Sequence, residues 1–573
     1  MDAICASTLI ILSFVLVVAY FTTRIVIVTI FILGSSMTLP AVRDVSPLNF
    51  ELFEAELRLY PDRAKANFIL QGIKEGFRLG CDNPVTLKSA RRNKLSAYQH
   101  SGVIDMYLAN EVRLGRVAGP FDVPPVPDLH VSSFGVIPKK GQPGKWRLIV
   151  DLSSPLGHSV NDGIDPESWH LQYIKMDDII KMVSKFGPGA LVAKFDIDSA
   201  YRNIAIHPSD RHLLGMKWRN AYYIDLALPF GLRSAPAIFN SVAELVEWIL
   251  VHNYGILDLL HYLDDFIMAA PANSVVCASN LQVAVAVVAR LGLPLHPQKC
   301  VGPATCIVVL GIELDTAAQI ARLPADKFSA LQEALSHWST RKCCTKKDLQ
   351  SLIGRLHHAC MVVWPGRTFL RRMINLLSCF RNDSHPIRLN VEFRKDLAWW
   401  VEFFGQWNGI SFFLFPSLEP LPDFSVSSDA SGAIGYGAFL DNEWFNGRWS
   451  TLQFPLSIAY KELFPVVLAA HVWGPGWSRR RILFHVDNEA VVHILNSRTS
   501  PDPNIMHLLR SLLKAAACFS FTFAAIHVPG RNNGIADALS RFNFQAFFTQ
   551  APQAKKIPTF IPPQLLAQLS IVI

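Results

Sequence analysis

Cysteine patterning of the kind that binds zinc is missing from the sequence. None of the ten cysteines forms a Cys-x-x-Cys pair, which argues against a zinc ribbon or zinc knuckle and favours reduced, mostly buried thiols. No segment repeats at the periods of solenoid proteins. Charged residues make up only 17% of the chain, but both signs are present and 50% of the residues are hydrophobic. This composition excludes an intrinsically disordered chain and predicts several packed cores.

Length and charge set broad limits on the class of protein. A chain of 573 residues predicts about four domains of roughly 150 residues each. Lysine and arginine number 54 against 46 aspartates and glutamates, which gives a formal charge of +8. This small excess permits a polyanionic partner without establishing one.

The first 36 residues form an apolar segment. Ile4 to Thr23 contain no charged residue, so this run is long enough to span a bilayer. Only Asp2 precedes it, and the basic stretch typical of a cleaved signal peptide is absent. Two interpretations stay open: a single-pass membrane anchor, or a start assigned upstream of the natural one at Met37.

Proline-rich stretches mark the expected domain boundaries. They are "GPFDVPPVPD" (119–128), "FPSLEPLPDF" (415–424) and "APQAKKIPTFIPPQ" (551–564). We expect a multidomain chain of α/β and α+β character. Its expected parts are the apolar segment 1–36, a helical region 37–125, a mixed region of strands and helices 126–320, a helical region 321–420, an α/β region 421–545 and a tail 546–573.

Adjacent aspartates in "LLHYLDDFIMAA" (259–270) indicate a first site. Asp264 and Asp265 stand between apolar runs, although aspartate is rarely buried unless it is paired or bound to a metal. A plain hairpin turn would favour Asn-Gly or Asp-Gly. Upstream, "LVAKFDIDSAYRNIAI" (191–206) alternates like a strand and is expected to place Asp196 and Asp198 on one face. Carboxylates from two strands would form a Mg²⁺ site; the alternative is a solvated turn between edge strands.

Two further segments carry features suited to phosphate chemistry. "VIPKKGQPGKWRLIVDLSSP" (136–155) predicts a hairpin that could fold Lys140 and Arg147 over a triphosphate. "LALPFGLRSAPAIFN" (226–240) predicts a tight turn leading into a helix, whose start suits an anion or a template backbone. Each feature alone is a weak indication, because basic hairpins are usually solvated surfaces.

In their order along the chain, these motifs closely resemble those of the reverse transcriptases of retroelements. "KFDIDSAY", "LPFGLRSAPAIFN" and "YLDD" resemble the first three motifs of that family. "LPLHPQKC" (293–300) resembles its lysine motif, and "VVLGIEL" (308–314) its primer-grip hairpin. The resemblance covers about residues 120–545. "KWRLIVDLSSP", "SVNDGI" and "RLPADK" point to the DIRS-like branch, with gypsy-like elements as the alternative.

The resemblance implies a right-hand polymerase, with fingers and palm in 126–320 and a thumb and connection in 321–420. The third residue of the first motif is usually neutral or basic, so Asp198 is a departure whose default interpretation is a solvated surface acid. The roles implied for individual residues are catalytic and metal-holding carboxylates at Asp196, Asp264 and Asp265, contacts to the incoming triphosphate from Lys140 and Arg147, a steric gate against ribose at Tyr201, and a proton donor to pyrophosphate at Lys299.

Four acids in the 421–545 region indicate a second site. "DFSVSSDASGAIGYGAFLDNEWFNGRW" (423–449) predicts three short strands, followed by the helix "SIAYKELFPVVLAAHVW", the strand "RILFHVD", two helices, the strand "FTFAAIHV" and the helix "GIADALSRF". Along these elements lie Asp429, Glu462, Asp487 and Asp537. Four carboxylates around two Mg²⁺ ions suit phosphodiester hydrolysis.

The order of these elements and acids resembles the ribonuclease H domain that follows reverse transcriptases. Cellular ribonucleases H carry a histidine in the loop before the last aspartate, whereas this chain has Arg531 there. His527 lies earlier, on the strand, and is interpreted as structural.

The resemblance therefore implies an RNA-directed DNA polymerase with ribonuclease H activity, encoded by a retrotransposable element in the cytoplasm or nucleus. Its expected cofactors are two Mg²⁺ ions per active site, with Mn²⁺ as a substitute. Its expected partners are an RNA template, a DNA primer, RNA–DNA hybrids and deoxynucleoside triphosphates, with a membrane only if residues 1–36 are genuine. The helical region would touch duplex backbone electrostatically through its basic residues Arg341, Lys342, Lys346 and Lys347.

Two alternative functions stay open. One is an RNA-templated RNA polymerase, which Tyr201 and the four acids of the second site argue against. The other is a degenerate remnant that only binds nucleic acid or is anchored to a membrane, which the intact set of seven acids argues against.

Overall fold

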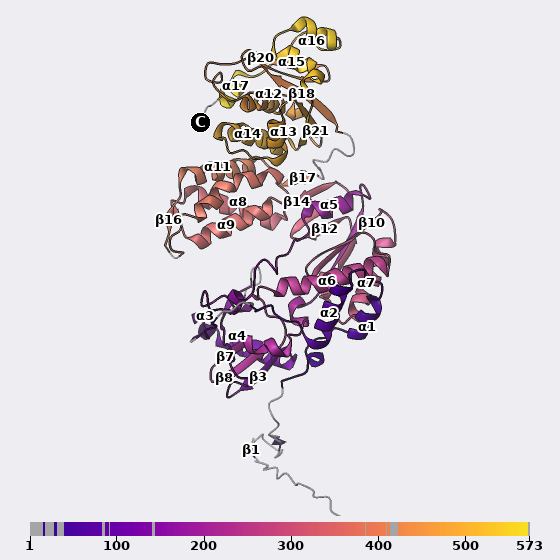
Figure 1. Cartoon of the computed structure of the whole chain (residues 1–573), viewed down its shortest axis with the longest axis vertical. Helices are drawn as coiled ribbons and strands as arrows, with labels where there is room; N and C mark the ends of the chain where they lie inside the picture. Colours follow the sequence, from indigo (N-terminus) through magenta and orange to yellow (C-terminus); the bar gives the residue numbers. More distant parts are fainter. Residues whose placement is uncertain are drawn as a thin grey trace, which may run out of the picture. The chain divides into compact units, whose positions relative to one another are not determined.

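The structure is a computed structural model, shown in Figure 1. It describes residues 15–17, 28–30, 39–82, 86–90, 92–139, 144–383, 385–407, 409–412 and 422–570. The chain forms two compact units. The first comprises Met1–Ile174, Lys194–Met268 and Ser279–Cys300, and the second comprises Lys175–Ala193, Ala269–Ala278 and Val301–Ile573.

The membrane anchor considered for residues 1–36 falls largely outside the described residues. Its described parts are strands β1 (Val15–Val17) and β2 (Val28–Ile30), which pair antiparallel. The described residues of this segment are therefore strands. Within the described part of the chain, no helix is long and apolar enough to cross a membrane.

The sheet that carries the first acids has two largely buried central strands, β6 and β10. Its order is β11-β6-β10-β9, with β11 at Val301–Ala304, β6 at Leu191–Asp196, β10 at Asp265–Ala270 and β9 at Leu259–Tyr262. Phe195 and Phe266 of neighbouring strands stack with ring centroids 4.8 Å apart, and both are fully buried. Continuous apolar runs therefore surround the aspartates because helices and strands cover both faces of the sheet.

Helices and a second sheet complete the first unit. The helices are α1 (Phe50–Glu56), α2 (Arg63–Glu75), α3 (Leu95–Gln99), α4 (Ser101–Arg113), α6 (Ala235–His252) and most of α7 (Val276–Arg290). The second sheet has the order β3-β8-β7, with β3 at Val117–Phe121, β8 at Ala221–Asp225 and β7 at Gly215–Trp218. The expected basic hairpin is present as β4 (Ser133–Pro138) and β5 (Trp146–Asp151). Helices α3 and α4 share one hydrophobic core with this hairpin.

The second unit begins with a predominantly helical part. Its strands β12 (Cys306–Val309), β13 (Ile312–Asp315), β14 (Ile320–Arg322) and β17 (Ile410–Phe412) form one antiparallel sheet. The helices are α5 (Met176–Ser184), α8 (Ala325–Thr340), α9 (Lys346–Ala359), α10 (Arg371–Leu377) and α11 (Val391–Gln406). Helix α8 starts directly after Pro324, which confirms the start predicted from "LPADK".

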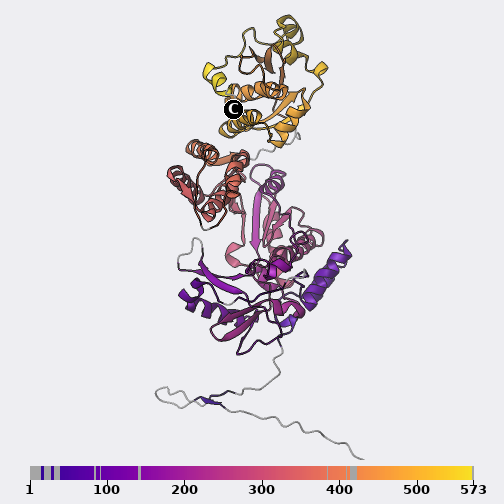
Figure 2. The same cartoon turned by 60° about the vertical axis from the view of Figure 1, so that its left-hand side comes forward.

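The last quarter of the chain, orange to yellow in Figures 1 and 2, forms an α/β body with a five-stranded sheet. The strand order is β20-β19-β18-β21-β22; the strands are β18 (Phe424–Ala430), β19 (Gly435–Leu440), β20 (Glu443–Arg448), β21 (Arg481–Val486) and β22 (Thr522–His527). Its helices are α12 (Ile458–Val472), α13 (Glu489–Ser497), α14 (Pro503–Phe519) and α15 (Gly534–Ser540). Every strand and helix predicted for 423–540 is confirmed.

The segment expected to be a tail packs against this α/β body. It carries α16 (Phe544–Gln550) and α17 (Pro563–Leu569). Between them, the backbone N–H of Thr559 donates to the carbonyl of Trp444 at 2.7 Å, and the Trp444 indole N–H donates to the Lys555 carbonyl at 2.6 Å. Farther on, the Tyr460 hydroxyl donates to the Leu569 carbonyl at 3.2 Å. The residues after 550 therefore cover part of the edge strand β20 and are integral to the body.

Candidate active sites

The turn between β9 and β10 holds the adjacent aspartates. Tyr262 pairs with Asp265, so Leu263 and Asp264 form a two-residue hairpin turn. Leu263 has a φ of +54°, a conformation that residues other than glycine seldom adopt. The Asp264 carbonyl accepts a hydrogen bond at 3.0 Å from the N–H of Ile197, just after β6. The turn is thereby tied to the end of the strand that carries Asp196.

Asp196, Asp264 and Asp265 lie close enough for their charges to interact, but among the described residues they do not form a group whose carboxylate oxygens all lie within 4.8 Å of one another. Asp196 ends β6 and is 3% exposed. Burial and the charge of Asp196 raise the pKa of Asp264. Burial, together with the neighbouring Asp196 and Asp264 carboxylates, raises the pKa of Asp265 to about 6. Three crowded carboxylates repel one another when ionised, so this donor set suits a divalent cation, which prefers oxygen ligands and relieves the repulsion.

Lys299 already supplies one positive charge at this site. Its ammonium donates to both carboxylate oxygens of Asp196, at 2.9 and 2.8 Å.

Asp198 does not share a face with Asp196, although the alternating pattern had predicted that it would. Strand β6 ends at Asp196, and Asp198 is an exposed residue beyond it whose carboxylate accepts from the Ser199 hydroxyl at 3.1 Å. The alternation ended two residues earlier than expected because the chain turns at Ser199, which has a φ of +54°.

Tyr201 lies in the short 3-10 helix η3 (Ala200–Asn203) beside the carboxylates. Its ring is half-buried against Phe230 and Phe239, with centroids 5.3 and 5.8 Å away. Burial, two neighbouring tyrosines and the charge of Asp264 raise the pKa of Tyr201 to about 12, so the hydroxyl stays protonated at neutral pH.

The triphosphate contacts expected on the hairpin are placed only in part. Arg147 is exposed on β5, opposite Ile137 of β4. Lys140 lies outside the described residues.

The turn before α6 is held by two residues that the sequence analysis missed. The side chain of Asn161 is buried; its amide oxygen accepts from the N–H of Arg233 at 2.8 Å, and its amide nitrogen donates to the Gly231 carbonyl at 2.9 Å. Gly231 has a φ of +97°, and a Cβ there would lie 3.2 Å from the Val150 carbonyl. Asn161 lies within "SVNDGI", which pointed only to the DIRS-like branch and gave this residue no role.

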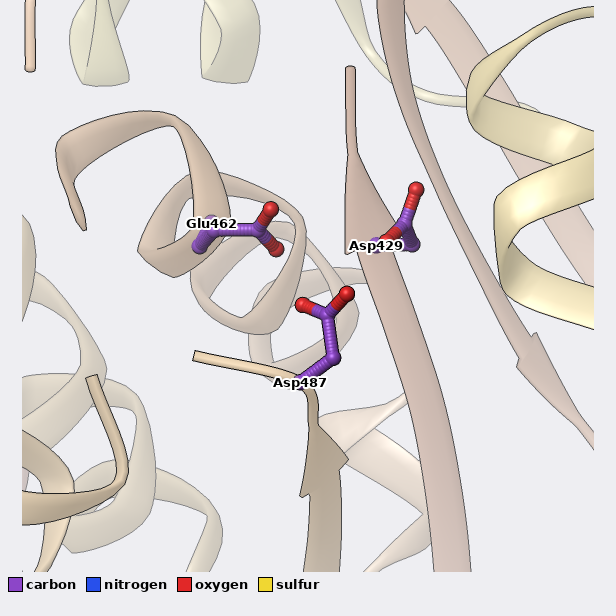
Figure 3. Close-up of side chains that lie close together, drawn as sticks. All are labelled: Asp429, Glu462 and Asp487. Carbon is purple, nitrogen blue, oxygen red and sulfur yellow. The ribbon is translucent and has the colours of Figure 1, made fainter. Parts of the chain in front are cut away.

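Three acids of the second site converge in the α/β body (Figure 3). Asp429 lies near the end of β18, Glu462 in the buried helix α12, and Asp487 directly after β21. Each offers a carboxylate oxygen, and these oxygens lie within 4.8 Å of one another. Strands β18 and β21 are parallel neighbours, so their carboxyl ends bring Asp429 and Asp487 to the same edge, where ligands of such sheets bind.

The burial and mutual repulsion of these three carboxylates favour the binding of a cation. Burial and the charges of Asp429 and Asp487 raise the pKa of Glu462 to about 9. Burial and the charges of Asp487 and Asp537 raise the pKa of Asp429 to about 6, against a hydrogen bond donated by the Ser540 hydroxyl. One carboxylate oxygen of Glu462 is buried and has no hydrogen-bond partner among the described residues. An unpaired buried oxygen facing two other carboxylates fits a divalent metal ligand.

Asp537 is outside the group of three carboxylate oxygens that lie within 4.8 Å of one another, although its charge raises the pKa of Asp429. It lies in α15, and its carboxylate accepts a 2.6 Å bond from Arg541 one helical turn later. His527 ends β22, and its Nε2 lies 3.1 Å from the Asp487 carbonyl. Arg531 is exposed in the loop before α15. The tetrad is therefore a close group of three with a fourth acid held by an arginine.

Comparisons with known proteins find matches for the region that carries the first site. Residues 137–314 match the family model described as reverse transcriptase (RNA-dependent DNA polymerase). The chain is 22% identical over 427 residues to the Transposon Tf2-3 polyprotein of Schizosaccharomyces pombe and 21% identical over the same length to the Tf2-7 polyprotein. These alignments cover 71% of this chain and 28% of each polyprotein.

Among solved structures, the chain is similar to the foamy viral protease-reverse transcriptase. The form in complex with double-stranded DNA is 14% identical, with a TM-score of 0.45 and coverage of 84% of this chain and 98% of that chain. The form in complex with an RNA/DNA hybrid is 12% identical, with a TM-score of 0.43 and coverage of 88% and 86%.

The matched residues contain all three carboxylates of the first site as well as Tyr201, Phe230 and Lys299. Residues 137–314 form a reverse transcriptase region related to those of retrotransposon polyproteins.

Proposed function

We propose that the chain is an RNA-directed DNA polymerase joined to a ribonuclease H. The observation that carries the polymerase is the gathering of Asp196, Asp264 and Asp265 at the ends of β6, β9 and β10 within the region that matches the reverse transcriptase family. The nuclease is supported by the close carboxylate cluster of Asp429, Glu462 and Asp487. The substrates would be an RNA template, a DNA primer, deoxynucleoside triphosphates and the resulting hybrid.

In the polymerase site, Asp196 and Asp264 would hold two Mg²⁺ ions, with Asp265 beside them. The bound ions would lower the barrier by stabilising charge on the attacking and leaving oxygens of phosphoryl transfer. The half-buried Tyr201 would lie under the sugar of the incoming nucleotide. Lys299, which is half-exposed and bonded to Asp196, would turn to the departing pyrophosphate.

In the nuclease site, Asp429, Glu462 and Asp487 would hold the ions, and Asp537 would join them from α15. Ser540 orients the Asp429 carboxylate through its hydrogen bond. Because the unpaired oxygen of Glu462 is buried, it is desolvated in advance and would bind a metal strongly.

The basic residues of the helical region are partly committed to internal ion pairs. Arg341 pairs with Asp348, and Lys346 pairs with Asp383 at 2.7 Å. Contacts to the duplex backbone would therefore depend more on Lys342 and Lys347 than on Arg341 and Lys346. A cation that is already paired with a carboxylate gains less from binding a phosphate, because fewer counterions are released from the nucleic acid.

Two variants of the full chain test the proposal. Wild type should extend a DNA primer on an RNA template and cleave the RNA of a labelled hybrid, both with Mg²⁺. Asp264→Asn should abolish extension and spare cleavage, and Asp487→Asn should do the reverse, because each removes a charge from only one site. Absence of both activities from folded wild-type protein would refute the proposal, and loss of both from either single variant would refute two independent sites.

A further inference from the structure

A fully buried guanidinium stands next to Tyr201. Arg202 is 4% exposed and follows Tyr201 in η3. Its Nε and one terminal nitrogen donate to Glu111 of α4 at 3.0 and 2.8 Å, and its other terminal nitrogen lies 2.8 Å from a carboxylate oxygen of Asp225 in β8. The two acids are 6% and 4% exposed. Burying three charges is costly, and burial raises the pKa of Asp225 even beside the arginine.

The same guanidinium also fastens the segment that leads into the next motif. The nitrogen that faces Asp225 donates to the Ala227 carbonyl at 2.9 Å and lies 3.4 Å from the Leu228 carbonyl. Arg202 therefore contacts helix α4, strand β8 and the loop after β8 at the same time. These contacts use all three nitrogens of its guanidinium group. A buried ion cluster adds little net stability compared with apolar packing, so its use here is to define one geometry.

The two chain segments that Arg202 joins each carry one ring of the same aromatic pair. Tyr201 is the residue before Arg202, and Phe230 lies two residues after Leu228. Their ring centroids are 5.3 Å apart. The same two segments are also joined by the Leu228 N–H, which donates to the Ile204 carbonyl at 3.0 Å, so the bonds from Arg202 to the Ala227–Leu228 backbone contribute to the separation and tilt of this pair without setting them alone.

We propose that Arg202 is the positioning residue for sugar discrimination. By locking η3 to the loop before Phe230, it holds the Tyr201 ring where a ribose 2′-hydroxyl would clash. This inference rests on the proposed polymerase function and extends it to a residue that touches no substrate. Steric exclusion acts over a few tenths of an ångström, so a ring held loosely discriminates poorly while the correct deoxynucleotide is still accepted.

Arg202→Lys is the direct test, because it keeps the charge and removes the fork that reaches Glu111, Asp225 and the loop together. Using the full chain, kcat/KM would be measured separately for a deoxynucleotide and its ribonucleotide counterpart, with Tm as the measure of folding. We expect the preference for the deoxynucleotide to fall by about tenfold, mainly through better use of the ribonucleotide. A folded variant with the wild-type preference would overturn the inference.

Matched variants separate positioning from general destabilisation. Asp210→Asn weakens another ion pair of the same unit, in which the exposed Arg78 donates to the buried Asp210 at 2.9 Å. It should lower Tm without changing the sugar preference. If Arg202→Lys does not fold, Asp225→Asn keeps the shape of the cluster while removing one charge, and it should relax the preference in the same direction; an unchanged preference there would also overturn the inference.

Wild type and Tyr201→Val distinguish a failure of the proposed polymerase function from a failure of the role given to Arg202. If wild type incorporates no deoxynucleotide, the polymerase proposal fails. If wild type is active and Tyr201→Val admits ribonucleotides while both cluster variants stay selective, only the role of Arg202 fails.

Discussion

Removing Lys299 is expected to tighten metal binding while weakening catalysis. The Lys299 ammonium occupies both carboxylate oxygens of Asp196, which are the atoms that a metal ion needs. Lys299→Met frees these oxygens and leaves Asp196 without the ammonium bonded to it. Because the lysine side chain is 51% exposed, solvent screens the contact, which is then worth about 1 kcal/mol. That free energy corresponds to a roughly fivefold tighter metal affinity.

The assay is calorimetric titration of Mn²⁺ into the full chain without nucleotide, in an Asp487→Asn background that weakens the nuclease site. Primer extension by the same Lys299 change without the Asp487 substitution should fall, because the ammonium would no longer meet the departing pyrophosphate. Lys194→Met is the matched control, since Lys194 influences the pKa of Asp265 through its charge. Its effect on Mn²⁺ affinity should be the smaller of the two. Unchanged or weaker Mn²⁺ binding in the Lys299 variant would refute the competition between ammonium and metal.

Three further changes test other parts of the structure. Tyr201→Val should admit ribonucleotides at little cost to deoxynucleotide use, as measured by single-nucleotide incorporation; a stable variant that still excludes them would refute the gate. Glu462→Gln, made in an Asp264→Asn background that weakens the polymerase site, should abolish hybrid cleavage and reduce the rise in Tm on adding Mg²⁺, while Tm without metal is little changed because a pKa of about 9 already keeps this carboxyl neutral; an undiminished rise relative to Asp264→Asn alone would argue against Glu462 as a ligand. Gly231→Ala should cost about 1–3 kcal/mol in denaturant unfolding, because its Cβ would meet the Val150 carbonyl at a φ of +97°. Gly157→Ala, at a φ of +77° with open space around its Cβ, should cost less, and equal losses would contradict the steric argument.

The sequence predicted those site residues whose type is rarely found in such surroundings for any other reason. Asp264 and Asp265 between apolar strands left little besides a metal site or a solvated turn, and the strand ends that carry Asp429 and Asp487 followed from period-two patterns. The alternation failed at Asp198, because a left-handed residue at position 199 ends the strand early. Local periodicity does not register such a turn.

Long-range polar contacts were beyond the reach of sequence patterns. Arg202 and Glu111 are 91 residues apart, and nothing near either residue indicates that they share a buried cluster. The pairing of Asp537 with Arg541 was likewise not indicated by the sequence, although the two residues are four apart on the same helix. The motifs predicted the candidate site residues, whereas the residues that hold them in place could be identified only from the structure.

The segment after residue 550 has a practical consequence for any shortened version of this protein. A boundary drawn at residue 545, at the end of the predicted α/β region, would remove the chain that hydrogen-bonds to Trp444 and covers part of β20. The exposed edge of β20 would then offer its backbone to other molecules, which is a common route to aggregation. Poor solubility of such a truncated protein would result from the loss of the segment that covers β20. A failed nuclease assay on it would therefore not test the role of Asp429, Glu462 and Asp487.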